Sequence, residues 1–198
     1  MEYTTKDVAK LREITGAGFA DCKNALAEAP SFDQAIKLIE AKGQKRAEKV
    51  KAADRETREG GIFSYIHHGN NLGVILELNC STDFVARSDE FKALGRELAL
   101  QIASMNPTYV SMADVPEGVK AKMREQLMED PEVQKRPENL RAQIVDGKVK
   151  KELVAQVLLE QPWVKDEKVL MGKLVDDVIR KTGENVVVRR FTRYALGE

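Results

Sequence analysis

The residues best suited to metal chemistry in this sequence are two histidines and two cysteines. His67 and His68 are adjacent, and on an extended chain their side chains point to opposite sides. A zinc site needs about four converging ligands, whereas Cys22 and Cys80 are far apart and form no C-x-x-C pattern. We therefore expect no metal site and no cofactor, and we interpret the two histidines as turn residues.

The sequence contains none of the common catalytic templates. It has no G-x-x-x-x-G-K-[ST] phosphate loop, no G-x-G-x-x-G turn, no H-E-x-x-H motif and no G-x-S-x-G nucleophile elbow. Carboxylates are numerous, but a chain that is 32% charged brings pairs of carboxylates together by chance. We predict that the protein is not an enzyme. An enzyme that uses scattered carboxylates is kept as an alternative.

The segment from Asn79 to Arg87 has the features of a protein contact. It follows a strongly apolar stretch and precedes a candidate helix, and it holds Phe84 and Val85 among polar residues. Phe84 has two interpretations. It anchors the segment by packing beneath it, or it is an aromatic wedge beside Asp83 that enters a polar site of another protein.

The elements before this segment form three short helical patterns in residues 1–43. The first begins after Thr4, and Pro30 ends the second. The third begins after Ser31 and is expected to end near Gly43. We predict a compact three-helix domain over residues 1–43, with apolar surface left for a partner.

Residues 44–60 are almost wholly charged or small, and they mark a domain boundary. Such a stretch could form an RNA-binding stripe, but its acidic residues and its lack of aromatic residues favour a solvated linker helix. Over the whole chain, Lys plus Arg equals Asp plus Glu at 32 each, so no global field attracts a polyanion. We expect no nucleic-acid partner.

Residues 61–198 have the pattern of an α+β domain, in which helices cover a small antiparallel sheet. Alternating apolar residues predict strands, and a 3.6-residue period predicts helices. The expected elements are a hairpin with strands at 62–66 and 72–78, a helix from Ser88 to Asn106, helices within 116–161 broken at Pro131, Pro137 and Gly147, a helix at 168–181, and a strand at 186–193.

The apolar stretches are far shorter than the ~20 residues that span a bilayer. The first ten residues, MEYTTKDVAK, lack the apolar core of a signal peptide and the Arg-rich character of a transit peptide. We expect a cytoplasmic protein with reduced cysteines and no membrane contact.

Two separated stretches resemble the elongation factor Ts family. They are LREITGAGFADCKNAL at residues 11–26 and ELNCSTDFVARSDEF at residues 77–91. Shorter similar pieces are YIHH, MNPTYV, LLEQPWVKD and GENVVVRRF, so the resemblance spans nearly the whole chain.

The resemblance implies a ubiquitin-associated-like N-terminal domain, a core domain and a non-enzymatic role in translation. That role is guanine nucleotide exchange on elongation factor Tu, bound in its GDP-bound and nucleotide-free states. The resemblance implies that one segment enters elongation factor Tu near its Mg²⁺ site and disturbs the metal, and that the N-terminal module makes further contacts. The first group, which is the segment near the Mg²⁺ site, is Thr82, Asp83, Phe84 and Val85. The second group, which makes the contacts of the N-terminal module, is Arg12, Phe19 and Ala20.

The chain departs from the family pattern at several points. The family often has Met-Met where this chain has Phe19-Ala20. Many members are longer, with a duplicated core and a helical-hairpin insertion, so the resemblance is to the short form, whose members pair as homodimers. Some of those carry a cysteine in the final strand, where this chain has Thr192. We therefore expect a non-covalent homodimer. A generic adaptor that binds peptides through its helical N-terminus is the second alternative.

Overall fold

The computed structural model describes residues 3–53 and 56–198 and divides the chain into two compact units. Residues 1–2 of the predicted N-terminal domain and 54–55 of the predicted linker lie outside the described residues. Unit 1 comprises Met1–Gly60, Asn79–Ser88 and Asp176–Val187, and unit 2 comprises Gly61–Leu78, Asp89–Val175 and Val188–Glu198. The predicted α+β class is confirmed, whereas the predicted division at residues 43 and 60 stays a prediction.

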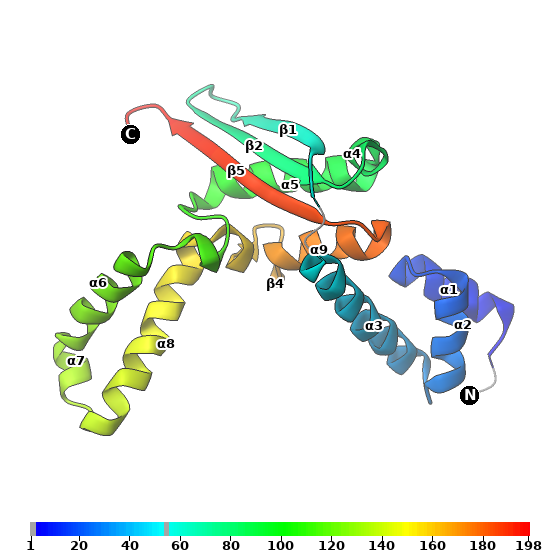
Figure 1. The fold of residues 1–198 in the computed structure, drawn as a ribbon, viewed down its shortest axis with the longest axis horizontal. Coiled ribbons are helices and arrows are strands. Elements are labelled where there is room, and N and C mark those ends of the chain that lie inside the picture. Colours follow the sequence, from blue (N-terminus) through cyan, green and yellow to red (C-terminus); the bar gives the residue numbers. More distant parts are fainter. Residues whose placement is uncertain (1–2, 54–55) are drawn as a thin grey trace. The chain divides into compact units, whose positions relative to one another are not determined.

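Unit 1 begins with the helices α1 (Thr5–Thr15), α2 (Phe19–Glu28) and α3 (Phe32–Ala52) (Figure 1). Thr4 caps α1 in a capping box with Asp7, and Ser31 caps α3 by accepting from the backbone N–H of Gln34. Apolar residues at helical spacing close a small core. Its buried members are Val8, Leu11, Cys22, Ala25, Leu26, Ala29, Ala35 and Ile39.

The third predicted helix does not end near Gly43, because α3 continues without a break to Ala52. Residues 44–52 of the predicted linker are therefore the C-terminal end of α3 and not a separate helix. Gly43 is not a helix stop in this context. A Cβ atom at this position would overlap the side chain of Arg180, so glycine allows that side chain to lie against α3.

The main sheet has the strand order β1 (Glu59–Ile66), β2 (Leu72–Cys80) and β5 (Val186–Ala195). The backbone N–H of Leu196 donates to the carbonyl of Asn71, and Arg190 pairs with Glu77, so β5 runs antiparallel to β2. The predicted hairpin and the predicted final strand are both confirmed.

One face of this sheet is covered by α5 (Asp89–Met105), as Figure 1 shows. The rings of Phe63 on β1 and Phe91 on α5 lie 5.9 Å apart. A side chain at Gly95 would collide with Phe63, so glycine allows the helix to approach the strand closely. The opposite face is exposed and carries several apolar side chains, which are Ile62, Ile66, Ile75 and Tyr194.

Unit 2 also contains a helical hairpin made of α6 (Glu117–Met128), α7 (Pro131–Gln134) and α8 (Glu138–Gln156). It follows a short 3₁₀ turn, η1 (Met112–Asp114). The chain therefore has a hairpin of its own, although the short form is expected to lack this insertion. The break predicted at Gly147 is wrong, because α8 passes through this residue, while Pro131 and Pro137 stand at helix starts as expected.

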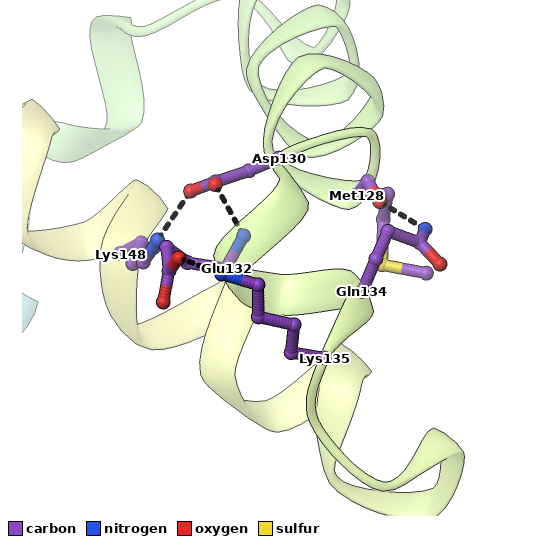
Figure 2. Close-up of polar contacts among 6 residues, drawn as sticks. All are labelled: Met128, Asp130, Glu132, Gln134, Lys135 and Lys148. Carbon is purple, nitrogen blue, oxygen red and sulfur yellow. Dashed lines mark hydrogen bonds and ion pairs between the residues drawn. The ribbon is translucent and has the colours of Figure 1, made fainter.

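Polar contacts fix the connection at the end of this hairpin (Figure 2). Asp130 caps α7 by accepting from the backbone N–H of Glu132 at 2.9 Å, and it also pairs with Lys148 of α8 at 2.6 Å. The two bonds to the charged form lower the pKa of Asp130, with the Lys148 bond the larger cause. The side chain thus ties α7 to α8.

The last helix, α9 (Met171–Thr182), begins three residues later than predicted. Its expected first turn belongs instead to β4 (Asp166–Leu170), which pairs with β3 (Pro162–Trp163) in an antiparallel ribbon after the turn η2 (Leu158–Glu160). No described helix is both long and apolar enough to cross a membrane.

Candidate functional site

The segment singled out in the sequence folds into a short helix, α4 (Asp83–Arg87), between β2 and α5. Thr82 stands at its N-cap with extended backbone, and its hydroxyl accepts from the backbone N–H of Val85. The segment is therefore a helical turn of defined geometry and not an irregular connection.

Two neighbouring residues of α4 have opposite environments. The side chain of Phe84 is 81% exposed, whereas Val85 is only 7% exposed. The interpretation of Phe84 as an anchor beneath the segment is therefore wrong, and Val85 is the residue that anchors it. An aromatic ring held in water exposes apolar surface that another protein can bury.

Several polar contacts hold the segment in place. The hydroxyl of Thr82 lies 3.0 and 2.9 Å from the two carboxylate oxygens of Glu184 and donates its hydrogen to that group. The Cys80 thiol donates to the carbonyl of Thr82 at 3.1 Å, and Arg87 pairs with Asp83 at 2.6 Å. These contacts hold the backbone of the turn that carries Phe84.

The cysteine beneath the segment, Cys80, is a free and buried thiol. Burial raises the pKa of the Cys80 thiol to about 11, so the thiol stays protonated at neutral pH. Cys22 is also free and buried. Neither cysteine is placed to react or to form an exposed disulfide.

The second predicted group lies on α1 and at the start of α2. Arg12 and Ala20 are exposed, and Phe19 is 51% exposed. Both groups belong to unit 1. Within the described residues, no hydrogen bond, ion pair or ring contact joins the first group to the second.

Sequence reasoning missed two supports of α4. Arg87 stands four residues after Asp83, a spacing that favours an ion pair on a helix, so a helical interpretation of the segment would have found it. Glu184 is 102 positions from Thr82, and no local pattern indicates that contact.

The histidines expected in a turn, His67 and His68, both follow the end of β1. The hydroxyl of Tyr65 on this strand is 3.0 Å from Nδ1 of His67. Among the described side chains, no group of three or more His, Cys, Asp or Glu residues is placed to hold a metal ion.

Comparison with known proteins gives matches over almost the whole chain. Residues 6–198 match the family model described as "Elongation factor TS". A protein named "Elongation factor Ts" from Fervidobacterium nodosum is 44% identical over 199 residues, with all of both chains covered. The protein of that name from Thermotoga maritima is 45% identical, with 98% of its length covered, and the one from Rippkaea orientalis is 44% identical, with 79% covered.

Proposed function

Because this chain belongs to the elongation factor Ts family, we propose that it is a guanine nucleotide exchange factor that binds elongation factor Tu and promotes release of GDP during translation elongation. It binds the GDP-bound and nucleotide-free states of that partner. In this proposal the chain works in the cytoplasm, performs no covalent chemistry and needs no cofactor. The exposed ring of Phe84 on a braced helical turn is the observation that carries the proposal.

Exchange by such a protein depends on competition between two binding events. GDP on a translational GTPase is held partly by Mg²⁺ that bridges phosphate oxygens, so disturbing the ion weakens several contacts at once. Coupling between two ligands is reciprocal, so the factor weakens GDP by the same amount that GDP weakens the factor. Each tenfold loss of GDP affinity requires about 1.4 kcal/mol of differential binding energy.

We assign the disturbance of the Mg²⁺ site to the tip of α4, which we define as Asp83 and Phe84. Phe84 is a wedge that enters elongation factor Tu near its Mg²⁺ site, and Asp83 accompanies it as a charged group that perturbs the surroundings of the ion. Burying an aromatic side chain contributes about 1.5–3 kcal/mol, which is enough for one to two of the tenfold steps. Thr82 and Val85 serve to position the tip, because one caps α4 and the other is buried.

The N-terminal module adds affinity in the same proposal. Arg12, Phe19 and Ala20 are exposed on α1 and α2 and form a second contact with elongation factor Tu. This contact does not perform exchange, because it lacks the segment from Thr82 to Val85 that is assigned to the Mg²⁺ site. Loss of Phe19 is therefore expected to weaken the complex without lowering the maximal rate of GDP release.

The test of the proposal follows labelled GDP as it leaves elongation factor Tu. The chain is expected to accelerate release, and Phe84→Ala is expected to slow the accelerated rate by about 10- to 100-fold. Leu140→Ala is the matched control, since it also truncates an exposed apolar side chain but lies on α8. Its rate is expected to equal that of the unaltered chain. Equal rates for Phe84→Ala and the control would exclude the wedge.

A second arm of the experiment addresses the metal. If the tip acts through Mg²⁺, raising the Mg²⁺ concentration opposes the factor, so the acceleration decreases as the ion is added. An acceleration that does not depend on Mg²⁺ would contradict the metal step while leaving exchange itself intact. If the chain did not accelerate GDP release and bound its partners equally well with and without nucleotide, the adaptor alternative would be favoured. If the isolated chain hydrolysed nucleotide, the enzyme alternative would be favoured.

We further propose that the protein is a non-covalent homodimer. The uncovered face of the main sheet carries Ile62, Ile66, Ile75 and Tyr194, drawn from all three strands. A second copy of the same face is a self-complementary partner under two-fold symmetry, and it would remove these side chains from water. Packing alone must hold this dimer, because both cysteines are buried and free.

A further inference from the structure

A pocket of about 440 Å³ lies within unit 1, where the loop between α1 and α2 meets α3 and the C-terminal end of α9. This volume falls in the range of about 300–1,000 Å³ that is usual for small-ligand sites. The lining includes one carboxylate, that of Asp21, and several cationic side chains. The cations are Arg12, Lys42, Arg46, Arg180 and Lys181.

Glycines let two of these cations, Arg46 and Arg180, approach the backbone closely. Lys181 lies against Gly16, with its Cε 3.5 Å from the place a Cβ would occupy, and Gly16 adopts a left-handed φ of 65°. Nη2 of Arg46 lies 3.1 Å from the corresponding point at Gly183. Arg180 fills the space that a side chain at residue 43 would need. Cations from α3 and α9 are thereby gathered beside one loop.

The protein neutralises only some of the cations in this pocket. Lys42 pairs with Glu28 at 2.9 Å, and Arg180 pairs with Asp177 at 3.2 Å. Within the described part of the chain, the lining cations whose side chains make no ion pair or hydrogen bond are Arg12, Arg46 and Lys181. Like charges that line one cavity repel each other, and a bound anion would relieve that repulsion.

We propose that this pocket binds a small polyphosphate, held through a diphosphate group. Guanidinium groups match phosphate oxygens with paired N–H donors, and a lysine ammonium adds a compact charge. The three unpaired cations carry more positive charge than a ligand with a single carboxylate could balance. A diphosphate carries more negative charge and has acceptor oxygens on two neighbouring phosphorus atoms. The N-terminus of α2 lies at the same wall and Gly18 caps it without a side-chain bond, but the carboxylate of Asp21 in the first turn offsets its polarity, so the cations carry the proposal. Free pyrophosphate and a nucleoside diphosphate share this chemistry.

Calorimetric titration of the full chain with sodium pyrophosphate tests the proposal directly. We expect saturable binding of one equivalent, with Arg46→Ala and Lys181→Ala each weakening it about tenfold or more. Lys45→Ala is the matched control, because Lys45 neighbours Arg46 on α3, is exposed, and loses the same charge without lining the pocket. The control is expected to bind pyrophosphate as the unaltered chain does.

Parallel titrations with GDP and with a short polyglutamate peptide distinguish the possible ligands. Binding of GDP that depends on Arg46 as strongly as pyrophosphate binding does would assign the pocket to nucleotides, and binding of pyrophosphate alone would assign it to the free anion. Either result supports the proposal. No binding of either phosphate compound up to about 1 mM would overturn it. So would an equal loss in Lys45→Ala, or a polyglutamate peptide that binds more tightly than pyrophosphate through the same two cations. The titrations use the isolated chain, so they do not depend on the outcome of the exchange assay.

Discussion

Phe84 and Val85 differ in their contributions, although they are adjacent on one short helix. Phe84 is exposed in the free protein, so its apolar surface is available only to a partner, whereas Val85 is already buried and contributes to folding. The two positions therefore separate binding from stability within a single turn of chain.

Substitution of these two residues is expected to show that separation. Val85→Ala is expected to lower the free energy of unfolding by about 1–3 kcal/mol, because it removes buried methyl groups and leaves a cavity. Phe84→Ala is expected to change it by less than about 0.5 kcal/mol. Urea unfolding followed by circular dichroism measures both values. A larger loss for Phe84→Ala than for Val85→Ala would mean that the ring packs against the protein in solution.

The hydroxyl of Thr82 has two roles, since it caps α4 and donates to Glu184. Thr82→Val keeps the shape and removes both bonds, so we expect a loss of about 0.5–2 kcal/mol in stability, together with slower GDP release from elongation factor Tu. Thr82→Ser keeps the hydroxyl, so we expect it to retain most of the stability and most of the rate of GDP release. If valine and serine gave the same release rate, the orientation of the tip would not depend on this hydroxyl.

At the scale of elements, the hairpin of α6, α7 and α8 depends on a charged cap. Asp130 has a lowered pKa, so its contribution to stability is present above the ordinary value of 3.8 and is lost as the pH falls through the lower value in the folded protein. Asparagine caps helices well but carries no charge.

Asp130→Asn is therefore expected to lower the melting temperature at neutral pH and to remove part of its dependence on pH below about 4. Glu129→Gln is the control, because it makes the same change of charge at the neighbouring exposed position. Melting curves recorded from pH 7 downward compare the three proteins. Parallel curves for the Asp130 variant and the unaltered chain would show that the Lys148 pair contributes nothing measurable.

The elements that the sequence predicts well are those whose signals are local. The alternation in β2, the turn before it and the cap of α3 at Ser31 lie within a few residues of the structure that they specify. The errors come from tertiary contacts and from helix context. Gly43 by itself indicates a helix stop, but the side chain of Arg180 lies against it and the helix continues. Gly147 by itself indicates a break, yet α8 runs through it.

The candidate site is predictable in part for the same reason. Its aromatic tip is a feature of one short segment, and the resemblance to a family identifies it. Its bracing by Glu184 and the gathering of Arg46 and Lys181 around one pocket join residues more than a hundred positions apart. No periodicity within a window of sequence records such contacts.

At the scale of the whole molecule, the exposed face of the main sheet is the feature that predicts assembly. Light scattering at micromolar concentration is expected to give the mass of a dimer, unchanged by reductant, because Cys22 and Cys80 are buried. Ile66→Lys is expected to give a monomer, since it places a charge in the apolar face. Leu140→Lys makes the same change on α8 and is expected to remain dimeric. A monomer for the unaltered chain would contradict the proposed pairing.

The unbroken course of α3 makes the number of residues in it as important as their identity. Ala35 and Ile39 face the small core of the first helices, and Gly43 and Arg46 line the pocket, all along one side of the same cylinder. Each residue added to a helix rotates the later residues by about 100° and advances them by about 1.5 Å. One residue inserted between Ile39 and Gly43 would thus rotate the pocket half of α3 out of phase with the core half, whereas seven inserted residues would return it to within about 20° of its present phase. Such an insertion would still move Gly43 and Arg46 about 10 Å along the axis, away from the loop between α1 and α2 that lines the same pocket. The number of residues between Ile39 and Gly43 is therefore fixed more strictly than the identity of the exposed side chains among them.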